Sequence, residues 1–382
     1  MIIARTYRFL FFSLCFIALS LLVKSSVGQR DSSAHWSVIV APQGGVIIPH
    51  HESVKHLIQG HSMGVHVFVN RQSDGSKFWH WAYNFPECGV DFTAINSGNT
   101  EQLGNQYSSS YLVNLPLNKD RRIQTKVGVS ERKFRHWIGL GIGLGYSTQR
   151  WDLETNHQAP MLGSRMNAAI SFQYSMRLAA FTFGEFRAGF RVLHFSNGAF
   201  QMPNLGTNNA GLFLSYATVK HSHRKVQAPP TPVIERYSLS VGLASGLKEI
   251  LPPNGRKYTA SVLSFLGEKR ISYKSALGVG FDVLYDASSI AVMELRNGSK
   301  PEASRAIQVG GLLSYSLFFD KLSFKMQQGI YIRDEFKLNG SLYHRFGLRY
   351  SIARRLYAQL TLKTHFAKAD YGEFGIGYLW RR

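Results

Sequence analysis

A histidine and a serine two residues apart, His194 and Ser196, open the stretch HFSNGAFQMPNLGTNN, which covers residues 194–209. A serine hydroxyl becomes a strong nucleophile when a base removes its proton, and histidine is the usual base. A third group must hold the base by accepting a hydrogen bond from its other ring nitrogen. Asn197, Asn204 and the backbone N–H of Gly198 are candidate donors to an oxyanion. The stretch therefore predicts a nucleophilic site, with the polar end of a strand as the alternative.

The residues before this stretch alternate as a β-strand does. Successive side chains of a strand point to opposite faces, and in 184–196 the even-numbered row is apolar until its last two members, His194 and Ser196. In the next predicted strand, 208–219, Asn208 extends an apolar row toward the same end. We therefore expect these three polar residues on one face, beside apolar side chains. The opposite row of the first strand carries the charged residues Glu185, Arg187 and Arg191.

The same alternation recurs from about residue 60 to the C-terminus and indicates an all-β fold. In ALGVGFDVLYD (276–286), for example, apolar side chains alternate with glycine and aspartate. A soluble sandwich also alternates, but a transmembrane barrel turns its apolar face to lipid and its polar face inward. The non-apolar face here is rich in glycine, lysine and arginine, and aromatic residues gather at strand ends. We therefore predict a transmembrane antiparallel β-barrel of about 14–16 strands.

Turn residues and one proline-rich segment divide the chain. We expect residues 30–60 to form a lead-in or small plug, 61–220 to form a barrel part, and 221–233 to be a proline-rich connection. Residues 234–382 are expected to add strands that complete the same barrel, with a second barrel as the alternative. The predicted strands lie near 64–70, 78–83, 89–95, 134–148, 166–177, 180–196, 208–219, 235–246, 256–268, 270–284, 305–318, 321–333, 341–352, 355–367 and 372–380.

The first 29 residues read as a secretory signal peptide. A charged start is followed by FLFFSLCFIALSLLV and a weakly polar end, and this apolar run is shorter than the roughly 20 residues that span a bilayer. Cys15 would leave with this peptide, so Cys88 remains alone and no internal disulfide is expected. Export and the barrel pattern together predict an integral protein of the cell outer membrane.

The charge of the chain favours an anionic partner. The formal net charge is +21, or +18 without the three basic residues of the signal peptide. Export makes nucleic acid an unsuitable partner, so we expect lipopolysaccharide instead, with no cofactor and no metal. The oligomeric state stays open.

The motif HFSNG followed by PNLG, at 194–206, resembles the signature of the outer-membrane lipid A deacylases, the PagL-type acyloxyacyl hydrolases. The resemblance covers about 190–217 well, is looser from about residue 60, and leaves everything after about 220 outside the match. It implies an esterase that removes an ester-linked acyl chain from lipid A. In it His194 would be the base, Ser196 the nucleophile and Asn204 the oxyanion-hole asparagine.

One position departs from this family. The orienting glutamate lies fourteen residues after the histidine, where this chain has Asn208. An asparagine carbonyl can orient an imidazole, but it cannot offset the imidazolium charge. The departure predicts reduced activity or a different orienting carboxylate, with Asp152 and Glu154 as candidates. The rival function is a non-enzymatic barrel, either a channel or a lipopolysaccharide-binding structural protein derived from a deacylase.

The sequence contains three further patterns that could indicate function. Histidines cluster in PHHESVKHLIQGHS (49–62), but their spacing matches no standard zinc site. The glycines of GLGIGLGYS (139–147) alternate like a strand and lack the Lys-Ser/Thr of a phosphate loop. Glu185 and Arg187 are expected to pair inside the barrel, and the alternative is that Arg187 and Arg191 line an anion-conducting lumen.

Overall fold

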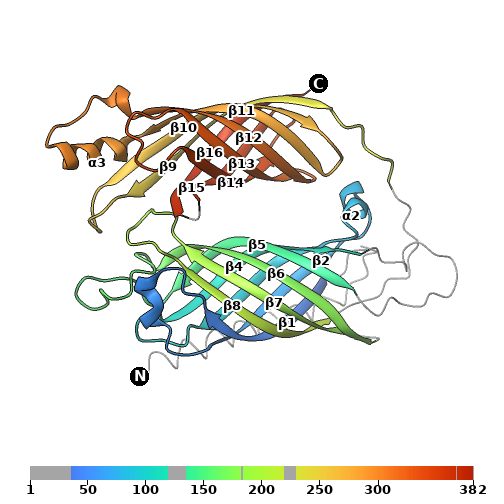
Figure 1. The fold of residues 1–382 in the computed structure, drawn as a ribbon. Coiled ribbons are helices and arrows are strands. Elements are labelled where there is room, and N and C mark those ends of the chain that lie inside the picture. Colours follow the sequence, from blue (N-terminus) through green and yellow to red (C-terminus); the bar gives the residue numbers. More distant parts are fainter. Residues whose placement is uncertain (1–35, 119–134, 182–183, 219–228, 367, 382) are drawn as a thin grey trace. The chain divides into compact units, whose positions relative to one another are not determined.

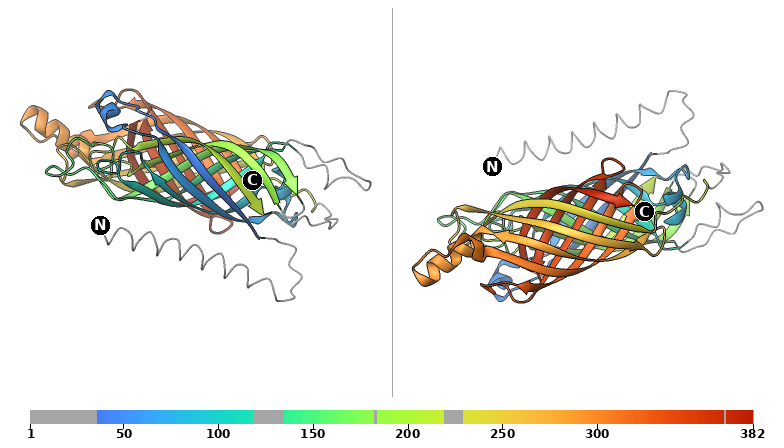
Figure 2. Two further views of the ribbon diagram at one scale, coloured as in Figure 1. Left: turned by 90° about the horizontal axis from the view of Figure 1, so that it is seen from below. Right: turned by 90° about the horizontal axis from the view of Figure 1, so that it is seen from above.

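The computed structural model describes residues 36–118, 135–181, 184–218, 229–366 and 368–381. Within these residues the strands close into two antiparallel barrels of eight strands each (Figure 1). In each barrel the strands lie side by side and are tilted relative to the barrel axis (Figure 2). No helix among the described residues has the length and apolar character needed to cross a membrane. The predicted signal peptide lies outside the described residues.

The first barrel runs from β1 to β8 and closes where β1 pairs with β8. A 3-10 helix, η1 (Glu52–Leu57), follows the first strand, and a short helix, α2 (Phe78–Ala82), follows the second. The strands are β1 (Trp36–Ile47), β2 (Ser62–Gln72), β3 (Glu87–Asn96), β4 (Asn105–Pro116), β5 (His136–Ser147), β6 (Met166–Phe181), β7 (Gly184–Ser196) and β8 (Thr207–Thr218).

The second barrel runs from β9 to β16 and closes where β16 pairs with β9. Its longest connection carries α3 (Ala287–Asn297) and η3 (Ala303–Ala306). The strands are β9 (Tyr237–Glu249), β10 (Lys257–Arg270), β11 (Ser275–Asp286), β12 (Ile307–Phe319), β13 (Leu322–Arg333), β14 (Leu342–Ser351), β15 (Leu356–His365) and β16 (Lys368–Arg381).

The barrel fold is confirmed, but its closure differs from the expectation of a single barrel. The C-terminal strands form a barrel of their own instead of completing the first one. The reason is that β8 finds its partner in β1, and eight strands are enough to close a sheet around a filled interior. The proline-rich connection, of which 229–233 is described, therefore separates two closed sheets.

Three segments of the first barrel also differ from the sequence prediction. Residues 36–47, expected in a lead-in or plug, form β1. The sequence did not predict this strand because Pro42 and a glycine pair interrupt its alternation. Residues 105–116 form a strand that was missed, because its inward-facing residues are mostly polar. The segment 78–83, rich in aromatic residues that favour strands, instead contains the helix α2.

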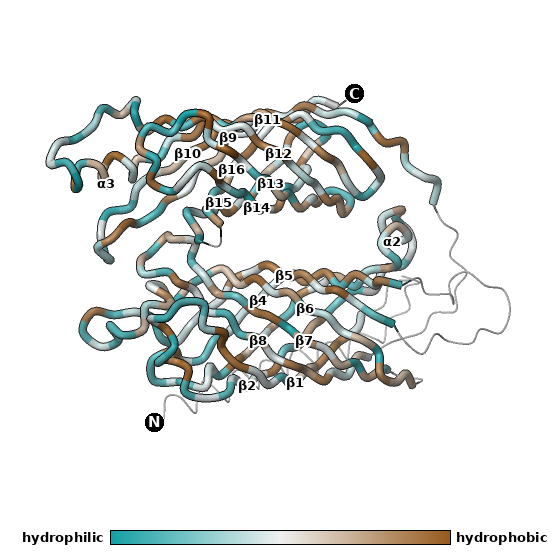
Figure 3. Tube along the Cα trace, viewed as in Figure 1, coloured by the Kyte–Doolittle hydropathy of each residue, from teal (hydrophilic) through white to brown (hydrophobic). Residues whose placement is uncertain are grey.

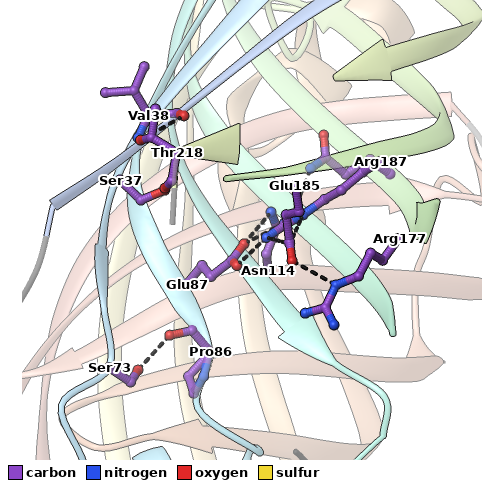
Figure 4. Close-up of polar contacts among 11 residues, drawn as sticks. Ser37, Val38, Ser73, Pro86, Glu87, Asn114, Arg177, Glu185, Arg187 and Thr218 are labelled. Carbon is purple, nitrogen blue, oxygen red and sulfur yellow. Dashed lines mark hydrogen bonds and ion pairs between the residues drawn. The ribbon is translucent and has the colours of Figure 1, made fainter. Parts of the chain in front are cut away.

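The interior of the first barrel is filled by paired charges (Figure 4). Arg187 binds Glu87 through two nitrogens at 2.9 and 2.7 Å and also binds Glu185 at 2.6 Å. The predicted Glu185–Arg187 pair is therefore confirmed. Arg191 binds Asp91 at 2.6 Å. Because both arginines are buried and paired with carboxylates, they fill the lumen and do not leave a free cationic lining.

Many of the exposed side chains on the strands of the first barrel are large and apolar, and hydropathy changes from residue to residue along the strands (Figure 3). Phe186 and Phe190 of β7 are about two-fifths exposed, whereas Arg187, which lies between them, is buried. At the end of the barrel that carries the loops 48–61, 97–104, 148–165 and 197–206, buried apolar side chains close the interior. This loop-end cluster consists of Ile47, Val54, Leu57, Ile95, Leu103, Ala159, Met161, Leu162, Ala169, Leu193 and Phe195.

Candidate functional site

His194 and Ser196 end the row of β7 that carries the exposed Phe186 and Phe190, at the end of the barrel that carries the loop-end cluster, and Ser196 itself is buried. The residues that alternate with them, Leu193 and Phe195, belong to that cluster and are almost fully buried. Their burial anchors the end of the strand and fixes the face on which the histidine and serine stand. Cross-strand pairing then places Asn208 of β8 directly opposite His194.

The His194 ring contacts this asparagine. Nδ1 of His194 lies 2.7 Å from Oδ1 of Asn208, so the amide carbonyl can accept a hydrogen bond from the imidazole. Asn208 therefore stands where the orienting member of a nucleophile–base–acceptor arrangement is required. The Nε2 atom is the ring nitrogen left to exchange a proton.

Two donors converge on the hydroxyl of Ser196. Asn204 Nδ2 lies 2.9 Å from Ser196 Oγ, and the backbone N–H of Gly198 donates to the same oxygen at 3.2 Å. The amide of Asn204 is fixed because its Oδ1 accepts a hydrogen bond from the backbone N–H of Asn197 at 3.0 Å. Two N–H donors beside a serine hydroxyl are groups from which an oxyanion hole can be built.

The side chain of Asn197, the third candidate donor, is used elsewhere. Its Nδ2 donates to Ser164 Oγ at 2.8 Å and to the carbonyl of Gln201 at 2.9 Å. These bonds stabilise the loop around the site. Asn197 therefore contacts Asn204 through its backbone N–H, and its side-chain NH2 group donates to Ser164 and Gln201 and not to Ser196.

Within the described residues, no hydrogen bond joins His194 Nε2 to Ser196 Oγ. The hydroxyl is held by Asn204 and Gly198 in this resting arrangement. The two side chains belong to one row of β7, at positions i and i+2. Apo enzymes often tighten such a bond only when the substrate binds.

Sequence reasoning missed one member of this constellation, His50. It follows β1 and reaches the site because β1 is the closing partner of β8, where the N–H of Ile48 donates to the carbonyl of Asn208 at 2.8 Å. Asn208 Nδ2 lies 3.1 Å from His50 Nδ1, and His50 Nε2 lies 2.8 Å from the carbonyl oxygen of Leu205. Recognition of residues 36–47 as the closing strand would have predicted this neighbour.

The loop after β7 is fixed beside the histidine by a glycine. Gly206 has a φ of +80°, and its N–H donates to the carbonyl of Met161 at 2.7 Å. A Cβ at this position would lie 2.8 Å from Cε1 of His194 and 2.9 Å from the carbonyl oxygen of Phe195. Both the backbone conformation and the space beside the imidazole therefore require glycine.

The alternative orienting carboxylates are not engaged with the histidine. Asp152 accepts hydrogen bonds from the N–H of Thr155, from its hydroxyl and from the N–H of Glu154, at 2.9–3.1 Å. The bonds from Thr155 and Glu154 hold the pKa of the Asp152 carboxyl below its usual value. Asp152 thus stabilises its own loop, and Asn208 is the residue that contacts the imidazole.

The histidines of 49–62 do not gather at one point. His51 accepts a bond from the N–H of Ser53 at the start of η1, and His56 Nε2 lies 3.1 Å from the carbonyl of Gln158. Among the residues that the structure describes, no group of three or more histidine, cysteine or acidic side chains is arranged to hold a metal ion.

The second barrel carries a related tripeptide in the corresponding strand. Its seventh strand, β15, ends at His365, and Phe366 and Ala367 follow in the sequence, where β7 has His194, Phe195 and Ser196. His365, however, is buried, with Nε2 3.0 Å from the hydroxyl of Tyr331. The histidine therefore faces the interior, and the nucleophile is absent from the sequence at this position.

Comparison with protein families matches both barrels. Residues 63–217 match the family described as lipid A 3-O-deacylase (PagL), and residues 236–382 match the C-terminal domain of acyloxyacyl hydrolase. The second match corrects the expectation that the family likeness ends near residue 220. None of the curated proteins matches the chain.

Solved structures give a much weaker likeness. A multiply substituted porin of Rhodopseudomonas blastica is 6% identical, with 91% of this chain and 100% of that chain covered, at a TM-score of 0.18. A triple mutant of the same porin is 7% identical with the same coverage, at a TM-score of 0.17. The two family matches together span both barrels, and the chain belongs to the PagL-type family of lipid A deacylases.

Proposed function

We propose that this protein is an integral outer-membrane esterase that removes an ester-linked acyl chain from lipid A. The proposed site lies on the lipid-facing exterior of the first barrel. The observation that carries it is the contact set around β7: His194 bonded to Asn208 on one side, and Ser196 bonded to Asn204 and to the N–H of Gly198 on the other. Family membership supplies the substrate class.

In the proposed reaction Ser196 is the nucleophile and His194 the base. Ser196 Oγ turns from Asn204 toward His194, gives its proton to Nε2 and forms a bond to the ester carbonyl carbon. The carbonyl oxygen becomes an oxyanion, which the amide of Asn204 and the N–H of Gly198 stabilise. Asn208 accepts from Nδ1 throughout and keeps the imidazole in place.

Collapse of this intermediate completes acyl transfer. The bond to the sugar oxygen breaks, and His194 returns the proton to that oxygen as the sugar hydroxyl leaves. Water then attacks the acyl-serine with His194 again as base, and the carboxylic acid and free Ser196 are released. Each step uses the same two donors and the same ring nitrogen.

The surface around the site suits a lipid substrate. Across from His194, Ile170 of β6 is 40% exposed, and Leu212 of β8 is 72% exposed further along the barrel. An acyl chain that lies along this apolar band brings its ester to the polar end where Ser196 stands. The excess of basic residues in the whole chain favours a phosphorylated partner.

The channel reading of the first barrel finds no support in its interior. The arginines expected to line a pore are buried and bonded to carboxylates. The test of the esterase is mass spectrometry of lipid A after incubation with the purified protein and with Ser196→Ala. Loss of one acyl mass with the native protein alone supports the proposal. Loss with both proteins, or with neither across several lipid A types, would refute it.

A further inference from the structure

We propose that His50 is a positioning residue of this site, which fixes the amide of Asn208 and through it the tautomer of His194. The inference rests on the proposed function, since it assigns His50 a part in the same reaction. Its basis is a chain of three hydrogen bonds that begins at the carbonyl oxygen of Leu205 and ends at His194.

This series of hydrogen bonds can run in only one direction, because its first member, the carbonyl oxygen of Leu205, can only accept. A backbone carbonyl oxygen has no proton to give. His50 Nε2, 2.8 Å from the carbonyl oxygen of Leu205, must therefore carry the proton of this bond. In a neutral imidazole the other nitrogen is then bare, so Nδ1 of His50 is an acceptor.

Because His50 Nδ1 is an acceptor, it sets the orientation of the Asn208 amide. The amide NH2 group donates to that nitrogen across 3.1 Å, and the carbonyl oxygen is left facing His194 at 2.7 Å. Nδ1 of His194 must then carry a proton, and its Nε2 is bare. This is the tautomer that can accept a proton from Ser196.

Without His50, neither orientation of the amide is specified. An Asn208 turned by 180° would offer its NH2 group to His194 Nδ1 and favour the tautomer with the proton on Nε2, which cannot act as a base. A carboxylate has no such ambiguity, because both of its oxygens accept. His50 thus supplies the orientation that an asparagine in place of the family's glutamate lacks.

The experiment is a double-mutant cycle on lipid A hydrolysis with His50→Ala, Asn208→Asp and the double variant. Aspartate keeps the size of asparagine but accepts through both oxygens. We expect His50→Ala to lower kcat about tenfold with KM little changed in the native background, and less than about twofold in the Asn208→Asp background. An equal loss in both backgrounds, or no loss in the native one, would overturn the inference.

His56→Ala is the matched control. His56 lies on η1 in the same connection and also contacts a backbone carbonyl, that of Gln158, but it does not touch Asn208. Any effect of His56→Ala should be the same in both backgrounds. A cycle that shows the same coupling for His56 as for His50 would mean that the connection as a whole, and not the His50 ring, controls Asn208.

A readout independent of activity separates this inference from the proposed function. Nitrogen-15 NMR of the His194 ring in the inactive Ser196→Ala protein reports which ring nitrogen carries the proton. We expect the Nδ1–H tautomer with His50 present and a mixture or the Nε2–H tautomer in His50→Ala. An unchanged tautomer overturns the role of His50 even if the deacylase is active, and a changed tautomer supports it even if no lipid A is cleaved.

Discussion

Replacement of Gly206 by alanine tests whether the space beside the His194 ring is essential. The added Cβ would lie 2.8 Å from Cε1 of His194, whereas ordinary contacts begin at 3.4 Å. The second close atom is the carbonyl oxygen of Phe195, which belongs to β7 and is held between β6 and β8. The imidazole is therefore the part that must move, by about 0.6 Å if it moves directly away.

Such a shift weakens the bond between His194 Nδ1 and Asn208 Oδ1, which is 2.7 Å long at present. The bond supports a positively charged imidazole in the transition state, and hydrogen bonds to charged groups contribute about 1.5–3 kcal/mol. At about 1.4 kcal/mol for each factor of ten, kcat should fall roughly 10- to 100-fold. The left-handed backbone adds about 1–2 kcal/mol of lost stability for a residue with a Cβ.

Gly340→Ala is the control for the backbone strain. Gly340 has a φ of +81°, close to that of Gly206, but nothing lies within 4 Å of the position that its Cβ would take. It should lose similar stability and keep full turnover. The assay is the rate of acyl release from lipid A, with thermal unfolding of each variant in detergent. If folded Gly206→Ala keeps a kcat within about twofold of the native value, the steric reasoning is wrong.

Four more outcomes follow from the contacts. Asn204→Leu should lower kcat about 100-fold or more with little change in KM, as loss of an oxyanion donor does. Steady-state kinetics on lipid A measures both constants, and a raised KM with an unchanged kcat would contradict the role. Asn208→Glu should raise kcat about tenfold, because a carboxylate supports the imidazolium better than an amide; unchanged or lower turnover would count against an orienting role. Arg187→Met removes the guanidinium that the buried carboxylates of Glu87 and Glu185 share and should cost about 3–5 kcal/mol in urea unfolding; a loss below about 1 kcal/mol would mean that this guanidinium is dispensable. His365→Ala should leave acyl release unchanged, and a loss of turnover in the folded variant would assign chemistry to the second barrel.

The sequence could predict which face each strand residue occupies, because that property depends only on period two. Residues 184–196 placed His194 and Ser196 on the face opposite Glu185 and Arg187, and the buried ion pairs agree with this division. Closure could not be predicted in the same way. It depends on the pairing of β1 with β8, two strands whose alternation says nothing about which partner each one takes.

The residues of the site divide in the same way: some are brought together by a local segment, and others only by closure of the barrel. Asn204 and Gly198 are close to Ser196 in the chain, so a single loop after β7 brings them together. His50 comes from another strand end, and only closure of the barrel places it beside Asn208. A residue that depends on closure is missed whenever the closing strand is missed, as β1 was.

Two amides occupy the positions that decide this chemistry, and an amide has two chemically different ends. The backbone N–H of Asn197 fixes Asn204 so that its NH2 group faces Ser196. On the other side of the serine, the proposed role of His50 gives Asn208 the opposite orientation, with its oxygen toward His194. A neutral orienting group avoids the desolvation that a carboxylate would suffer next to the apolar exterior, but it stabilises the imidazolium less. The gain in kcat expected of Asn208→Glu requires that support of the imidazolium be the larger of these two effects at this surface.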